Sequence, residues 1–158
     1  MKIMGLSLVL LLALVCILAG CRKKPAAAQV TIREATWNVE VADSSKERFA
    51  GLSGRTHLAD DEGMLFMYPA ERVLNFCMRD CVIPLDIVFI DGRSQVVSME
   101  TMAVEPDLAG RKVYRSAAPA QYALELPAGA MQQAGVQIGD KVTFSPGVPP
   151  AAKAEAGP

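Results

Sequence analysis

The sequence predicts a single, mainly β domain of the α+β class, built as a small barrel or sandwich of short strands with one or two short helices. Three observations predict this fold. The chain has 158 residues, a length that suits one domain better than two. Its apolar residues fall in short runs, several of which alternate with polar residues as half-buried strands do. Turn signals separate these runs at intervals typical of barrels and sandwiches.

The first strand and the first helix follow each other closely. Residues 36–41, TWNVEV, alternate polar and apolar side chains, which predicts a half-buried strand with its inward face formed by Trp37, Val39 and Val41. Ser44 and Glu47 then have the spacing of a capping box. This pattern predicts a short helix over residues 45–50, which Gly51 can end.

The remaining elements are predicted mainly from short apolar runs. Such runs predict strands over residues 64–68, 73–78, 85–90, 96–102, 121–126 and 141–144. The pair Asp91-Gly92 is a turn signal, so the strands on either side of it form a hairpin. Residues 128–134 form one or two helical turns, and Gly135 ends them.

The first 21 residues predict where the protein is located. Lys2 supplies a positive start, and residues 6–18 form an apolar segment of the length that secretory signals use. The segment 18–21, LAGC, resembles the lipobox of bacterial lipoproteins, in which the cysteine receives the lipid. We therefore expect residues 1–20 to be a lipoprotein signal peptide and Cys21 to be the site of lipid attachment.

The rest of the chain divides into three parts. Residues 21–29 form a tether, residues 30–145 the single mainly β domain, and residues 146–158 a disordered tail rich in Pro, Ala and Gly. Arg22 follows the cysteine, where retention in the inner membrane of Gram-negative cells usually requires Asp. In a Gram-negative host this predicts a protein in the outer membrane that faces the periplasm.

Several phrases in fixed order resemble one known family. They lie at residues 48–55 (RFAGLSGR), 63–66 (GMLF), 76–81 (FCMRDC), 83–91 (IPLDIVFID) and 122–129 (YALELPAG). In this order the sequence resembles the family known as domain of unknown function 192. The resemblance implies a compact, mainly β domain, often secreted or lipid-anchored, and it supplies no catalytic residue.

The sequence departs from the family pattern at four positions. Cys77 stands where members commonly have Trp, Asp80 and Cys81 where Asn-Thr is common, and Ser53 where Met is common. If those residues shape a pocket in other members, the resemblance implies that the pocket differs in this chain.

The cysteine pair Cys77 and Cys81 allows three interpretations. Four residues of straight strand span about 13 Å, too far for a disulfide, whose Cα atoms lie within about 7 Å. A tight turn over residues 78–80 would allow a disulfide between them, whereas two free buried thiols are the alternative. A third reading uses Cys77, Met78 and Cys81 as soft ligands for a metal such as Cu(I), although Met is more often a core residue.

A second set of candidate site residues is polar. Asp86 could accept hydrogen bonds from turn amides or pair with an arginine such as Arg48, Arg55 or Arg79. We expect these four residues to form a structural or ligand-binding polar cluster. His57 is the only histidine, it lies in a polar loop, and no catalytic motif surrounds it.

Together these observations favour a lipid-anchored cell-envelope protein that acts as a small binding or accessory module rather than an enzyme. The alternatives are an envelope enzyme acting on a cell-wall or saccharide substrate, and a protein that handles soft metals or thiols. No cofactor motif is present. The net charge of −1 argues against a nucleic-acid partner, so the membrane is the one partner that the sequence predicts.

Overall fold

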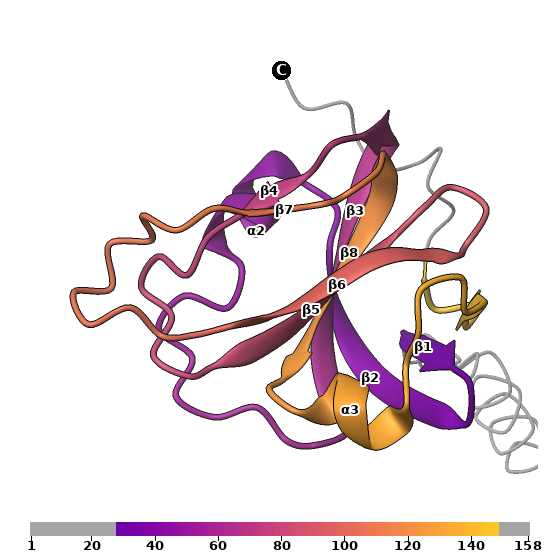
Figure 1. Ribbon diagram of the computed structural model, residues 1–158, viewed down its shortest axis with the longest axis horizontal. Helices are drawn as coiled ribbons and strands as arrows, with labels where there is room; N and C mark the ends of the chain where they lie inside the picture. Colours follow the sequence, from indigo (N-terminus) through magenta and orange to yellow (C-terminus); the bar gives the residue numbers. More distant parts are fainter. Residues whose placement is uncertain (1–27, 149–158) are drawn as a thin grey trace, which may run out of the picture.

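The computed structural model describes residues 28–148, which form a curled seven-stranded sheet, a small two-stranded sheet and two short helices (Figure 1). The order in the large sheet is β6-β5-β8-β3-β2-β1-β9, and β4 pairs with β7 in the small one. The elements are β1 (Gln29–Ile32), β2 (Ala35–Ala42), α2 (Ser45–Ala50), β3 (Glu62–Arg72), β4 (Asn75–Phe76), β5 (Leu85–Ile90), β6 (Val96–Met102), β7 (Tyr114–Arg115), β8 (Ala120–Pro127), α3 (Ala130–Ala134) and β9 (Val142–Phe144).

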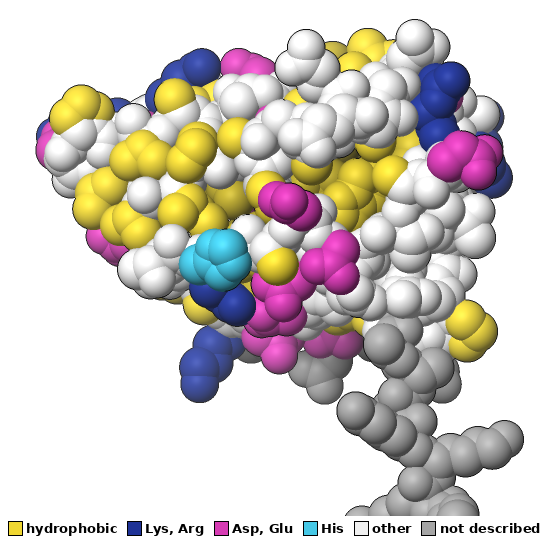
Figure 2. All heavy atoms as spheres, turned by 90° about the horizontal axis from the view of Figure 1, so that it is seen from below, with side chains coloured by type: hydrophobic (Ala, Val, Ile, Leu, Met, Phe, Trp, Pro, Cys, Tyr) yellow, Lys and Arg dark blue, Asp and Glu magenta, His cyan; other side chains and the backbone are white. Residues whose placement is uncertain are grey.

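The surface of the described residues has no single dominant charge on the face drawn in Figure 2. Acidic side chains gather there beside hydrophobic ones, and Lys and Arg side chains stand in separate places. Within residues 28–148, neither helix is long and apolar enough to cross a membrane.

The large sheet curls because its two edges meet at one end. All neighbouring strands are antiparallel except β2 and β3, and an isolated bridge joins Gln95, before β6, to Lys141, before β9. The Val96 amide donates to the Asp140 carbonyl at 3.0 Å, and the Val142 amide donates to the Ser94 carbonyl at 2.9 Å. The sheet is therefore a half-barrel.

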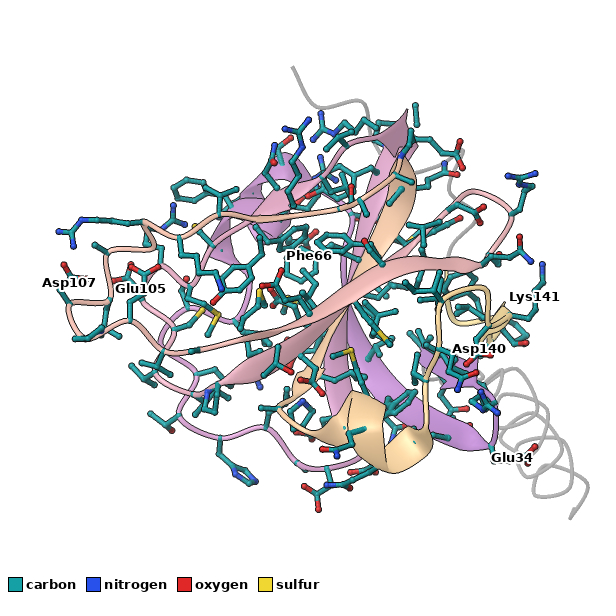
Figure 3. All side chains as sticks on the ribbon, viewed as in Figure 1. Glu34, Phe66, Glu105, Asp107, Asp140 and Lys141 are labelled. Carbon is teal, nitrogen blue, oxygen red and sulfur yellow. The ribbon has the colours of Figure 1, made fainter. Side chains whose placement is uncertain are left out.

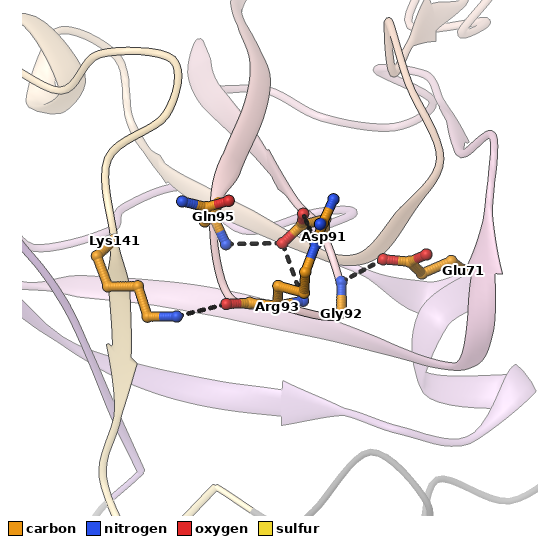
Figure 4. A network of polar contacts seen from close by, with 6 residues as sticks. All are labelled: Glu71, Asp91, Gly92, Arg93, Gln95 and Lys141. Atoms are coloured by element: carbon orange, nitrogen blue, oxygen red, sulfur yellow. Dashed lines mark hydrogen bonds and ion pairs between the residues drawn. The ribbon is translucent and has the colours of Figure 1, made fainter.

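Polar contacts hold the β5–β6 turn at this closed end (Figure 4). The Asp91 carboxylate accepts hydrogen bonds from the backbone amides of Arg93 and Gln95, at 3.0 and 2.8 Å. Glu71 accepts one from the Gly92 amide, and the Lys141 ammonium donates to the Arg93 carbonyl. The Asp91-Gly92 turn that the sequence predicts is confirmed, and the side chains of Glu71 on β3 and Lys141 just before β9 bind the backbone of the turn.

Two hydrophobic cores lie on the two faces of the sheet. The inner core fills the half-barrel and includes residues from both edges, such as Val96 and Val142. The outer core lies between the sheet and a layer made of α2, β4, β7 and their loops. Phe66 lies in this outer core, between β3 and the covering layer (Figure 3). The central strand β5 is buried on both faces, which explains why every residue in it except Asp86 is apolar.

The mainly β fold and most of the predicted elements are confirmed. The Ser44–Glu47 capping box forms as predicted, since the Glu47 amide donates to Ser44 Oγ at 3.2 Å and the Ser44 amide donates to Glu47 Oε2 at 3.0 Å. The run at residues 73–78 is a strand only over Asn75–Phe76. Two short strands, β1 and β7, were not predicted.

The ends of the domain extend slightly beyond the predicted bounds. β1 begins at Gln29, the last residue assigned to the tether, and Val148, assigned to the tail, packs against the inner core. The predicted signal peptide, Cys21 and the rest of the tail lie outside the described residues.

Candidate functional site

Asp86 has a structural position on the inner face of the sheet. It is 1% exposed, and it accepts hydrogen bonds from the Thr101 hydroxyl at 2.7 Å and from the amides of Gly129 and Met131 at 2.9 and 3.0 Å. Because it binds the amides at the start of α3, the alternative of turn amides is confirmed. The expected cluster of Asp86 with arginines is corrected, since strand alternation turns Asp86 away from the face that carries them.

Arg55 and His57 also lie apart from any site. Arg55 forms an ion pair with Glu40 at the surface, and His57 is exposed. Neither side chain contributes to the pocket that Arg48 and Arg79 line.

That pocket opens between the outer face of the sheet and the covering layer. It has a volume of about 200 Å³. Its walls come from α2 and the turn after it, from β3 and β8, and from the segment 75–81. The two predicted site residues Arg48 and Arg79 thus come together here, without Asp86 or Arg55.

Both guanidinium groups of the pocket are held by backbone carbonyls. Arg48 Nη1 donates to the carbonyls of Asp43 and Met67, the latter at 2.9 Å, and its guanidinium lies 5.0 Å from the centre of the Tyr68 ring. Arg79 Nη2 donates to the Phe49 carbonyl at 2.8 Å, and its guanidinium lies 4.1 Å from the Phe49 ring centre. Their positive charges are therefore positioned rather than free to swing.

Aromatic rings give the pocket an apolar wall. Phe66 and Phe76 both line it, and their ring centres lie 4.9 Å apart in an edge-to-face arrangement. Phe76 also packs edge-to-face against Phe89 at 5.8 Å. Such pairs add stability beyond their buried area, so the three rings support one another in this wall.

Glu125 is the unexpected residue of the pocket. On β8 the side chains of Tyr122, Leu124 and Leu126 point into the inner core, so Glu125 points to the outer face, where it lines the pocket. It is 5% exposed, and among the described residues no hydrogen bond or ion pair reaches its carboxyl group. Burial raises the pKa of this carboxyl to about 8, so that it is mostly protonated at neutral pH.

Sequence reasoning missed Glu125 because its strand alternates. A charged residue opposite an apolar face normally points to solvent, but here a second layer covers that face. One sequence feature could have indicated it: Glu125 lies in the YALELPAG segment, one of the segments on which the family resemblance is based.

The two cysteines line the same pocket as free thiols, one of the readings that the sequence left open beside a disulfide. The Cys81 amide donates to the Met78 carbonyl at 3.2 Å and closes a tight turn, with Asp80 at a φ of 55°. Burial, followed by the nearby Glu125 and Cys77, raises the pKa of Cys81 to about 11. At neutral pH its thiol stays protonated.

The soft-metal reading of Cys77, Met78 and Cys81 stays a prediction. Met78 is fully buried in the outer core and does not line the pocket with the two cysteines. Within residues 28–148 there is no group of three or more His, Cys, Asp or Glu side chains that could hold a metal ion.

The comparisons with known proteins agree with this fold. The family model DUF192, described as an uncharacterised family, matches residues 28–144. The chain belongs to the DUF192 family. No curated protein matches the sequence.

Solved structures of two bacterial proteins resemble this DUF192 chain. A protein of unknown function from Novosphingobium aromaticivorans is 33% identical, with a TM-score of 0.68, over 73% of this chain and 83% of that one. A protein from Sinorhizobium meliloti, provisionally named a transcription regulator, is 29% identical, also with a TM-score of 0.68, over 77% of this chain and 93% of that one.

Three of the four positions at which this sequence departs from the usual DUF192 pattern line the pocket. They are Ser53, Cys77 and Cys81. The Ser53 hydroxyl donates to the Arg79 carbonyl at 3.0 Å, so it also helps to hold the turn that carries the arginine. Three of the positions that the resemblance marks as departures therefore lie at the pocket that contains Glu125.

Proposed function

We propose that the chain is a lipid-anchored binding module of the bacterial cell envelope, and that its ligand site is the pocket that contains Glu125. The main support for this site is Glu125. The residue is 5% exposed and lines an open pocket, and its carboxyl group has no hydrogen-bond or ion-pair partner among the described residues. Its oxygens reach the accessible surface of the pocket, so a ligand can hydrogen-bond to them, and such a bond is stronger in this little-exposed setting than in open water.

Binding is favoured over catalysis by the composition of the pocket. A protonated glutamic acid in an apolar setting suits a general acid, but Glu125 is the one carboxyl group among the lining residues. Glycoside hydrolysis by the usual route needs a second carboxylate about 5–9.5 Å away. A buried thiol with a raised pKa, such as Cys81, is also a poor nucleophile.

A nucleic-acid role is not part of this proposal. One relative is provisionally named a transcription regulator, but this chain has a net charge of −1, and acidic side chains gather on the face drawn in Figure 2. Phosphate backbones require a basic surface.

The ligand site can be tested with a fragment library by thermal shift. We expect fragments that stabilise the wild-type protein to lose their effect in Glu125→Leu, which replaces the carboxyl by an apolar group of similar size. They should keep it in the control Glu40→Gln, which changes a carboxylate outside the pocket. Fragments that stabilise wild type and Glu125→Leu equally would contradict the site.

The anchor rests on the LAGC segment at residues 18–21, and the outer-membrane location rests on Arg22. Both are tested separately from the pocket. Cys21→Ala should release the protein from membranes or leave an unprocessed precursor, as judged by fractionation and mass spectrometry. In a Gram-negative host the wild-type protein should appear in outer-membrane fractions and face the periplasm. A mature-sized Cys21→Ala protein that stays in the membrane would contradict the anchor.

A further inference from the structure

We propose that the Glu125 pocket selects a small organic anion with an apolar body, whose carboxylate lies between the Glu125 carboxyl group and the guanidinium groups of Arg48 and Arg79. This inference rests on the proposed function and adds the chemical class of the ligand. It follows from three properties of the pocket: its charge, its size and its hydrogen-bond donors.

The charge of the pocket is positive. The titratable or charged side chains that line the pocket with Glu125 are Arg48 from α2, Tyr68 from β3, and Cys77, Arg79 and Cys81 from the segment after β4. Among them, Tyr68 and Cys81 lie close enough for the Glu125 charge to affect their pKa values. β4 contributes Asn75 and Phe76, and β5 packs against Glu125 with Ile87, none of which titrates. Asp80 lies 3.9 Å from Arg79, but its side chain is 68% exposed to water, which weakens its effect.

Neither arginine neutralises Glu125, although both line the same pocket. Each is held by backbone carbonyls, Arg48 at Asp43 and Met67 and Arg79 at Phe49. With Glu125 mostly protonated, two positive charges face a cavity that holds no ionised carboxylate of its own. An anion is the ligand that such a field attracts, and a cation is repelled.

The size and the walls of the pocket limit the body of the ligand. Its volume of about 200 Å³ is somewhat larger than the cavity of about 150 Å³ that holds benzene in another protein. Phe66, Phe76 and Tyr68 supply apolar contact. One aromatic ring or a short branched chain fills this space, with one polar end.

The donors of the pocket suit a carboxylate at that polar end. A protonated Glu125 donates one hydrogen bond, and guanidinium groups form charge-assisted hydrogen bonds to carboxylate oxygens. A bound anion also favours the protonated form of Glu125, because two negative charges in the same small pocket repel each other. Binding is therefore coupled to proton uptake, and the affinity falls when the pH rises above the pKa of Glu125.

The test uses three probes of similar size and different charge: benzoate, benzamide and benzylamine. Isothermal titration calorimetry on the full-length protein in detergent is expected to show benzoate binding at least about 10-fold more tightly than the other two. At pH 8, in buffers with different ionisation enthalpies, benzoate binding should take up about half a proton.

Variants then assign the contacts. Arg79→Gln should weaken benzoate binding by about 10- to 100-fold, and Arg79→Lys, which keeps the charge, by less. Arg55→Gln, which changes an arginine outside the pocket, should leave the affinity for benzoate unchanged. Glu125→Gln keeps a donor, so benzoate should still bind, but without proton uptake.

The outcomes separate this inference from the proposed function. Tighter binding of benzylamine, with proton release, would overturn the anion inference and leave the binding site standing. The same holds if library fragments bind through Glu125 but benzoate does not, or if Arg79→Gln and Arg48→Gln both bind benzoate as wild type does. If neither the library nor the three probes bind, both proposals fall.

Discussion

Glu125 makes the stability of the folded domain depend on pH. In the unfolded chain its carboxyl group has an ordinary pKa near 4.5, and burial raises the folded-state pKa to about 8. Between these values the folded state holds a proton that the unfolded state has lost, so this group's contribution to stability is full below pH 4.5 and is lost as the pH rises towards 8.

Glu125→Gln removes this dependence, because its amide does not ionise. We expect the free energy of unfolding of the variant to increase relative to wild type between pH 5 and pH 8, by an amount on the order of a few kcal/mol. Urea unfolding at several pH values measures this difference. Glu40→Gln is the control and should follow the wild type, and a wild-type minus Glu125→Gln difference that stays constant with pH would contradict the raised pKa.

The two thiols of the pocket should react at different rates. Cys77 is partly exposed, whereas Cys81 is 6% exposed and has a pKa raised to about 11. Since the thiolate is the reactive form, we expect iodoacetamide at pH 8 to modify Cys77 first and Cys81 at least about 100-fold more slowly than an ordinary thiol. Mass spectrometry of Cys77→Ser and Cys81→Ser proteins, after reduction, measures each rate. Comparable rates would contradict the burial of Cys81.

At the scale of single residues, the sequence predicted those site residues that a local sequence pattern indicates. Cys77 and Cys81 were selected as a pair because they are four residues apart, and both line the pocket. Arg48 and Arg79 were selected as well, but with Asp86 as their partner. The actual companion, Glu125, is distant in the chain and looked like an ordinary solvent-facing residue of an alternating strand.

Among the elements, α3 depends on a residue of another strand. The helix has five residues, and its start has no side-chain cap from Gly129. Instead, Asp86 on β5 accepts the amides of Gly129 and Met131 as well as the Thr101 hydroxyl. A helix this short is not stable by itself, so the carboxylate of Asp86 holds it on the sheet.

Asp86→Ala should therefore be strongly destabilising. Three donors lose their acceptor, of which the Met131 amide bond is buried and the other two are partly buried, and we expect the free energy of unfolding to fall by about 3 kcal/mol or more. Urea unfolding measures the loss. The control Asp60→Ala changes an exposed aspartate and should stay within about 0.5 kcal/mol of wild type. A loss of similar size in both variants would argue against this role of Asp86.

The elements that the sequence predicted carry their own local signals. The helix α2 has its capping box, and the β5–β6 hairpin has Asp91-Gly92 at its turn. β1 and β7 lack such signals. β1 has four residues and forms by pairing with β2 and β9, while β7 has two residues that pair with β4, about forty positions earlier. Strands of this kind arise from the tertiary fold, which local patterns do not contain.

For the whole molecule, the decisive feature is which face of the sheet each polar residue occupies. β5 and β8 are neighbours, with Asp86 opposite Leu126 and Ile87 opposite Glu125. A register shift of one residue would put both carboxyl groups on the same face. In the observed register Asp86 supports the inner face and Glu125 enters the pocket on the outer face, so one sheet separates a structural acid from a candidate ligand-binding acid.

This separation predicts that the half-barrel can be weakened without changing the pocket. Val142 on β9 is 2% exposed in the inner core, and its amide helps to join the two edges of the sheet. Val142→Ala should lower the free energy of unfolding by about 2 kcal/mol. It should also speed hydrogen exchange at the Val96 amide, which bonds across the same closure.

The pocket lies on the opposite face and shares no lining residue with β9. Under conditions in which the variant is fully folded, the alkylation rate of Cys77 in the pocket should therefore equal that of wild type. Thr143→Ala, on the exposed side of β9, controls for the substitution itself. A changed Cys77 rate in Val142→Ala alone would mean that the closed end of the half-barrel and the pocket are coupled, and the two faces would then have to be treated as one unit.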